Sequence, residues 1–181
     1  MKKKFSSVLL AMVFLLAVTM LFATSASAKK NKDKGSYITP TITAEQAITT
    51  VKAALPKLTT GKCFVKTGKR GEKNLEVALV LDGKIVSKVR LNPATGEILS
   101  KGQKVIVTQV LASQDQAVKI VQQAIPNLEV ASVQLGKQGE WKVDLTLKKA
   151  VVADIKVHSG DGSILPDWKA SRDVAMYPSF F

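Results

Sequence analysis

The side chains best suited to chemistry are scarce in this 181-residue chain. His158 is the only histidine and Cys63 the only cysteine. A zinc site of the usual kind needs several histidine or cysteine ligands. A proton relay between imidazoles needs a second histidine. A reactive thiol needs a histidine or a second cysteine beside it. We expect Cys63 to be a half-buried strand residue, and we predict no catalytic residue, no metal site and no cofactor: the chain is predicted not to be an enzyme.

The turn Gly160-Asp161-Gly162 is the other place where a ligand could bind. Aspartate in such a turn commonly hydrogen-bonds its own backbone, and a cation site would need more acidic ligands around it. No helix follows the turn, so it is not a phosphate loop. Alternation along the preceding strand places His158 on the outward face, with Val152, Asp154 and Lys156. We expect His158 and Asp161 to be solvated.

The N-terminus has the pattern of an export signal. Three lysines, Lys2 to Lys4, precede the apolar run Val8–Phe22, and Ala26-Ser27-Ala28 supplies a small-x-small cleavage site. We predict cleavage after Ala28 and export, to the medium, the cell envelope or the periplasm. The alternative is a membrane anchor formed by the uncleaved segment, because the apolar run is only slightly short for a span. Cleavage lowers the net charge from +13 to +10, since residues 1–28 hold three lysines and no acids.

Two amphipathic helices are predicted in the rest of the chain. The first covers Ala44–Leu55, with Thr43 as N-cap, Gln46 completing a capping box and Pro56 ending the helix. The second opens at Ser113 and ends at Pro126. Each has an apolar stripe that must pack against another element.

Short strands follow each helix. A first strand is predicted at Lys62–Thr67, and Leu75–Leu99 alternates apolar and polar residues around the hairpin signal Asp82-Gly83. A shift of 66 residues superimposes Leu75–Leu99 on Trp141–Leu165, and a shift of 70 superimposes the helices. A helix followed by four short strands, twice, is an internal duplication. The predicted fold class is α+β, with two tandem modules that each pack one helix on an antiparallel sheet of three to four strands.

The predicted organisation follows from these patterns. It is a signal peptide at 1–28, a flexible basic tail at 29–41, a first module at 42–102, a linker or strand at 103–111, a second module at 112–166 and an aromatic tail at 167–181.

The duplicated pattern resembles the PepSY family, which occurs in peptidase propeptides and in a germination protein, and the resemblance implies two tandem PepSY-like modules. The resemblance lies in Thr43–Ala47, in Pro56 and in the turn Asn92–Glu97; in the second module that turn becomes His158–Ser163 and keeps only the glycine. The resemblance implies a helix across an antiparallel sheet, an extracytoplasmic setting and a role in restraining peptidase activity. No protease follows in this chain, so inhibition would act in trans.

Positive charge is concentrated in the first module. Thr43–Lys101 carries eleven basic residues against five acidic ones, whereas Ala112–Trp168 carries six against seven. The outward strand positions of the second module are mixed in charge: Lys142, Asp144, Lys148, Asp154 and Lys156. The basic excess is explained either by a solvated surface or by a docking face for an acidic protein, anionic wall polymer or membrane surface. Nucleic acid is not an expected partner, because the chain is predicted to be exported and the basic region has few aromatics to stack bases.

The C-terminal tail is rich in aromatic residues. These side chains either cover an open sheet edge or core, or anchor a partner. The candidate partner-binding residues are therefore Lys62, Lys66, Lys69, Arg70, Lys73, Lys88, Arg90, Trp168, Tyr177, Phe180 and Phe181. The function expected from the sequence is a non-catalytic binding protein that modulates, by inhibition, an extracytoplasmic peptidase or another envelope protein. The alternative is a basic protein held on anionic wall polymer or on a membrane surface.

Overall fold

A computed structural model describes residues 39–179; the predicted signal peptide, most of the basic tail, Phe180 and Phe181 lie outside the described residues. The elements in chain order are α2 (Ala44–Ala54), β1 (Thr59–Thr67), β2 (Lys73–Leu81), β3 (Lys84–Leu91), α3 (Gln114–Ala124), β4 (Glu129–Leu135), β5 (Trp141–Leu147), β6 (Ala150–Val157), β7 (Ile164–Leu165) and α4 (Trp168–Met176). Short 3-10 turns at Leu55–Lys57 and Ile125–Asn127 follow α2 and α3. None of the helices in residues 39–179 is long and apolar enough to cross a membrane.

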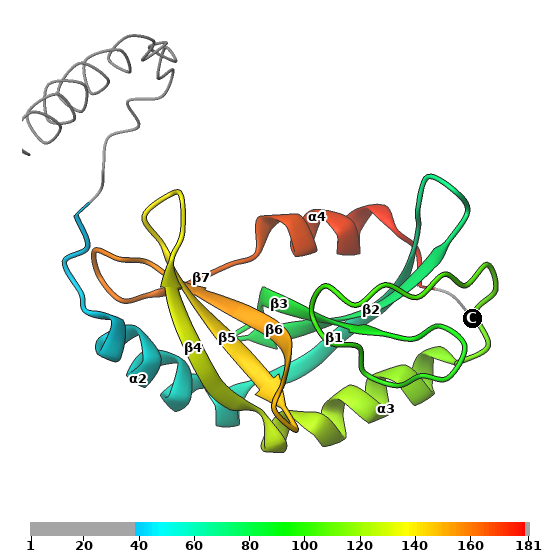
Figure 1. Ribbon diagram of the computed structural model, residues 1–181, viewed down its shortest axis with the longest axis horizontal. Coiled ribbons are helices and arrows are strands. Elements are labelled where there is room, and N and C mark those ends of the chain that lie inside the picture. Colours follow the sequence, from blue (N-terminus) through cyan, green and yellow to red (C-terminus); the bar gives the residue numbers. More distant parts are fainter. Residues whose placement is uncertain (1–38, 180–181) are drawn as a thin grey trace, which may run out of the picture. The chain divides into compact units, whose positions relative to one another are not determined.

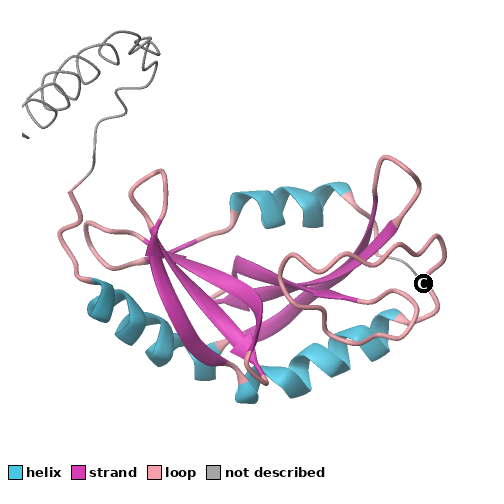
Figure 2. Ribbon diagram, in the orientation of Figure 1, coloured by secondary structure: helices cyan, strands magenta, loops and turns pink. Residues whose placement is uncertain are grey.

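The strands form two antiparallel sheets (Figure 1, Figure 2). The first sheet has the order β1-β2-β3 and the second the order β4-β5-β6-β7. In the first sheet a single bridge between Leu91 and Ile98 takes the place that β7 has in the second sheet. Each sheet carries one helix on its inner face, which confirms the predicted α+β class. The segment at 103–111, left open between linker and strand, contains no strand.

The helix ends follow the capping signals in the sequence. Thr43 and Gln46 form the predicted capping box at the start of α2, and Ser113 accepts from the Gln116 backbone N–H at the start of α3. Pro56 and Pro126 lie in the 3-10 turns, where the missing N–H costs no helical hydrogen bond.

The hairpin turn Asp82-Gly83 is also confirmed. Both residues have positive φ, +49° and +75°, as a tight two-residue turn between twisted strands requires. The strand alternation was wrong at Val152, which is only 6 % exposed. A register shift between Leu145 and Thr146, opposite this part of β6, turns Val152 into the core.

Each helix packs on the sheet of the other half of the chain. Figure 1 shows α2 under β4 and β5, and α3 under the first sheet. The indole N–H of Trp141 on β5 donates to the Ile42 carbonyl just before α2, at 3.1 Å. The helix of one repeat thus covers the strands of the other, an exchange that the sequence alternation did not indicate.

The exchange produces one continuous hydrophobic core. Val51 of α2 and Val121 of α3 are buried in the same cluster as the inward residues of both sheets. Burying one such valine stabilises the fold by about 1.5–3 kcal/mol. Neither half therefore holds a complete core of its own.

The two sheets meet along β3 and β6. Near this contact, the segment after each sheet donates a backbone hydrogen bond to a strand of the other sheet. The Lys101 N–H donates to the Val151 carbonyl at 2.6 Å, and the Asp167 N–H donates to the Ile85 carbonyl at 2.8 Å. Because 101 and 167, like 85 and 151, differ by the 66-residue repeat, these two bonds are equivalent under an approximate twofold relation. The segment that follows each sheet is thereby directed onto the outer face of the other sheet.

Candidate functional site

The first outer face is the surface of the first sheet that points away from α3. Its side chains are Lys62, Phe64, Lys66, Glu76 and Lys88. The helix α4 lies over β1 and β3 on this side, opposite α2 and α3 (Figure 1). Three of the seven basic residues predicted to bind a partner, Lys62, Lys66 and Lys88, therefore contact the protein's own C-terminal segment.

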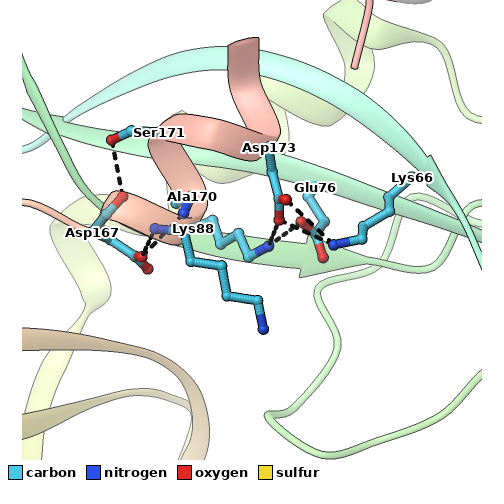
Figure 3. Close-up of polar contacts among 8 residues, drawn as sticks. Lys66, Glu76, Lys88, Asp167, Ala170, Ser171 and Asp173 are labelled. Atoms are coloured by element: carbon cyan, nitrogen blue, oxygen red, sulfur yellow. Dashed lines mark hydrogen bonds and ion pairs between the residues drawn. The ribbon is translucent and has the colours of Figure 1, made fainter. Parts of the chain in front are cut away.

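Local sequence explains why α4 forms. The Asp167 carboxylate accepts from the backbone N–H groups of Lys169 and Ala170, both at 3.0 Å, which is the N-cap arrangement. The Ser171 hydroxyl donates back to the Asp167 carbonyl at 2.9 Å (Figure 3). Ala170 and Asp173, three residues apart and thus on one helix face, are the buried residues of α4.

Asp173 is the ionic centre of this contact. Its carboxylate lies 3.2 Å from the Lys66 ammonium and 2.9 Å from that of Lys88, which also pairs with Glu76 (Figure 3). Although burial opposes ionisation of Asp173, hydrogen bonds and charge from Lys88 and then Lys66 hold its pKa below the usual value. Burial likewise opposes the charge of Lys88, and Glu76 and Asp173 raise its pKa.

Aromatic packing completes the covered face. The rings of Phe64 and Tyr177 are stacked, with centroids 6.3 Å apart and planes 9° from parallel. The Lys66 ammonium lies 5.6 Å from the Tyr177 ring centroid, within cation–π range. Lys62 donates to the Val174 carbonyl of α4 at 2.9 Å. Four of the predicted binding residues thus take part in the contact between the first sheet and the C-terminal segment: Lys62, Lys66, Lys88 and Tyr177.

A basic hollow remains beside this face. It has a volume of about 580 Å³, and its charged lining consists of Lys69, Arg70, Glu72, Arg90 and Lys104. The Arg90 guanidinium donates to the Gln103 and Ser100 carbonyls, which holds the loop that contributes Lys104. The structure therefore brings together three of the predicted residues, Lys69, Arg70 and Arg90, and adds Lys104.

Lys73 lies at the start of β2 and donates to the Thr67 hydroxyl at 3.0 Å. Trp168 is 78 % exposed at the beginning of α4. Whether any of the predicted residues binds a partner stays a prediction.

The second outer face is the equivalent surface of the second sheet. It consists of Ser132, Gln134, Lys142, Asp144, Asp154 and Lys156. Asp144 and Asp154 stand directly opposite each other on β5 and β6. The Lys101 ammonium pairs with both, at 3.2 and 2.9 Å, and stays 48 % exposed.

The residues considered for chemistry lie apart from one another. Cys63 is fully buried, more than predicted, and burial raises its pKa to about 11, so the thiol stays protonated. His158 Nδ1 lies 3.0 Å from an Asp161 oxygen at the surface. The Ser163 backbone N–H and hydroxyl, and then His158, hold the pKa of Asp161 below its usual value. Between residues 39 and 179 no three His, Cys, Asp or Glu side chains gather as a metal ion would require.

Sequence reasoning missed Asp173, Glu76 and Lys101 as members of the two faces. Asp167 ahead of Ala170 was a usable N-cap signal for a helix in the tail. Asp173 had no such signal, because its partners lie 85 and 107 positions away in the chain.

In comparisons with known proteins, no family model, no curated protein and no solved structure matches the chain.

Proposed function

We propose that this protein is an exported, non-catalytic binding protein that inhibits an extracytoplasmic peptidase or restrains another envelope protein. The export pattern and the PepSY resemblance of the first module support the setting and the class of target. The observation that carries the proposal is α4 on the first outer face. It is an example, within the chain, of a helix bound by this type of sheet surface.

The duplication extends that observation to the second half. The two sheets share strand register and inward residues, so their outer faces have equivalent backbones. On the second outer face Lys142, Asp144, Asp154 and Lys156 are partly exposed. A segment of another protein can occupy this surface as α4 occupies the first.

Inhibition by such a protein needs no chemical step. A rigid domain that covers a substrate cleft blocks access, and interfaces of about 800 Å² per partner suffice for tight inhibition. The shared core supplies the rigidity, because the exchanged helices tie both sheets into one unit.

Residues 29–181, incubated with the peptidases secreted by the source organism, test the proposal. We expect a peptidase to co-purify with the protein and its cleavage of a peptide substrate to slow. Following the protein itself on gels separates inhibition from competition as a substrate. Absence of binding together with unchanged cleavage of the substrate would refute the proposal.

The basic hollow favours a second candidate function, attachment to an anionic polymer of the envelope. Lys69, Arg70, Arg90 and Lys104 surround it against one acid, Glu72. Co-sedimentation with anionic wall polymer should weaken as salt rises, because exposed charges are screened. The variant K69E/R70E should lose most of the binding, whereas K148E/K149E, an equal change of charge on the β5–β6 turn, should keep it. Equal loss in both variants would indicate attraction by net charge alone.

A further inference from the structure

Each outer face has a pair of side chains of like charge, and one side chain of opposite charge lies between them. On the first outer face the Asp173 carboxylate lies between the ammonium groups of Lys66 and Lys88. On the second, the Lys101 ammonium lies between the carboxylates of Asp144 and Asp154. In both cases the bridging residue comes from the segment that crosses over from the other half.

A third pair of like charges has no such bridge. Lys142 and Lys156 stand directly opposite each other on β5 and β6, one step along the strands from the aspartates. Both side chains are partly buried, and neither forms an ion pair with a described residue. Like charges opposite each other on neighbouring strands destabilise a sheet. The nearby Asp144 and Asp154 are engaged by Lys101, and the buried Glu140 carboxylate beside Lys156 accepts from the Gln138 backbone N–H. A carboxylate from elsewhere therefore fits the position between the two lysines.

An exposed aromatic side chain lies near Lys156, one member of the lysine pair. Lys156, His158, Leu165 and Trp168 line a cavity of about 270 Å³. Trp168 is 78 % exposed, although the helix it begins is seated on the protein. Tryptophan is among the residues enriched at interface hot spots.

We propose that the second outer face binds an acidic helical segment of a partner protein, with a carboxylate between Lys142 and Lys156 and an apolar side chain against Trp168. This proposal rests on the proposed binding function and names its surface. A helix is the expected form, because α4 is the segment found on the equivalent face of the first sheet.

Segments of this chain match the lysine pair poorly. Residues 29–38 hold four lysines and one aspartate, so their charge is of the wrong sign. The α4 of a second copy would bring Lys169 and Arg172 along with Asp173. An acidic segment of a different protein is therefore the occupant that the charges favour.

The test uses a synthetic peptide with the sequence of residues 167–177 and the substitutions K169E and R172E, held helical by an i,i+4 cross-link because a free peptide this short is only marginally helical in water. Titration into isotope-labelled protein, residues 29–181, should shift the NMR signals of Lys142, Lys156 and the Trp168 indole. K142E/K156E should bind the peptide about tenfold more weakly or worse. K148E/K149E, with the same change in net charge, should bind as the wild type does. K142Q/K156Q serves as a second variant should the glutamates next to Asp144 and Asp154 disturb folding.

The peptide without the two substitutions is the matched probe for charge and should bind more weakly. No binding of the acidic peptide, or equal binding to the wild type and K142Q/K156Q, would overturn the proposed surface. Shifts confined to the first outer face would overturn it as well, since they would show displacement of α4. If K142E/K156E no longer binds the peptide yet still inhibits a peptidase, this surface is wrong as the peptidase site while the proposed function stands.

Discussion

On the first outer face a helix, α4, covers β1 and β3, whereas on the second a single lysine, Lys101, bridges two aspartates on β5 and β6. The difference begins at equivalent positions. Phe64 stands opposite Glu76 in the first sheet, and Gln134 stands opposite Lys142 in the second. Phe64 is fully buried under Tyr177, while Gln134 is exposed. The duplicated strands therefore share an inner surface, and one outer surface has become internal while its counterpart has remained accessible.

Separating the two halves should have the largest effect, because both outer faces stand on the same exchanged core. Residues 29–111 and 112–181, made as separate chains, should each fail to form a folded monomer, since α2 and α3 would lack the sheets they cover. Mixing the two chains should restore a folded one-to-one complex. Size-exclusion chromatography with light scattering and NMR peak dispersion measure both outcomes.

A folded monomeric half would contradict the exchange. It would show that each helix can cover its own sheet, which is the arrangement predicted from the sequence. Homodimers of one half would agree with the exchange, because two identical halves can trade helices as domain-swapped proteins do.

Replacing Asp173 by alanine should have the next largest effect and act on the first outer face alone. The change leaves the partly buried Lys66 and Lys88 without their shared carboxylate. Lys88 keeps its pair with Glu76 and Lys66 is partly exposed, so we expect a loss of about 1–3 kcal/mol, the cost of leaving partly buried donors without their acceptor. Urea unfolding followed by circular dichroism measures the free energy of unfolding.

The matched control is Asp161→Ala, because Asp161 pairs with His158 at the exposed turn. It should lower the free energy of unfolding far less than D173A does, because solvent screens an exposed pair. Equal effects of D173A and D161A would mean that α4 is held by its apolar contacts and not by the ion pairs.

Much of the fold could be predicted from local patterns. The capping box at Thr43, the turn at Asp82-Gly83 and the prolines after both helices depend on residues a few positions apart, and all are found in the structure. The pairing of helices with sheets could not be predicted this way. Val51 and Val121 occupy equivalent places on equivalent stripes, so either helix fits either sheet by its apolar pattern.

The outer faces were harder still to predict. The sequence predicts Lys88 and Arg90 as partner-binding residues, but strand alternation says only that a side chain points away from the core and not what covers it. The covering residues are Asp173 for Lys88 and the carbonyls of Ser100 and Gln103 for Arg90. Long-range charge pairing leaves no periodic pattern in a sequence.

Acid should loosen the first outer face through Asp173. Its pKa in the folded protein lies below the ordinary value of 3.8, so its stabilising contribution is complete above that value and is lost as the pH falls through the lower folded value. The free energy of unfolding of the wild type should therefore decrease more between about pH 5 and about pH 2 than that of D173N. Urea unfolding of both proteins across this range checks the difference. Parallel curves for the two proteins would assign the acid sensitivity to other carboxyl groups.

Removing the Lys101 side chain should have the smallest effect on the free energy of unfolding. Lys101 nevertheless lies in the segment that is equivalent, by the 66-residue repeat, to the segment that carries Asp173. Its ammonium is 48 % exposed, and screened pairs of this kind contribute about 0–1 kcal/mol. Lys101→Ala also leaves Asp144 and Asp154 opposite each other, and their repulsion adds a few tenths of a kcal/mol that salt should suppress. Urea unfolding of K101A at low and high salt measures both effects, and K101A/D144N should recover the loss at low salt. A loss as large as that of D173A would mean that Lys101 closes the second outer face as firmly as α4 closes the first, and that face would then be no surface for a partner.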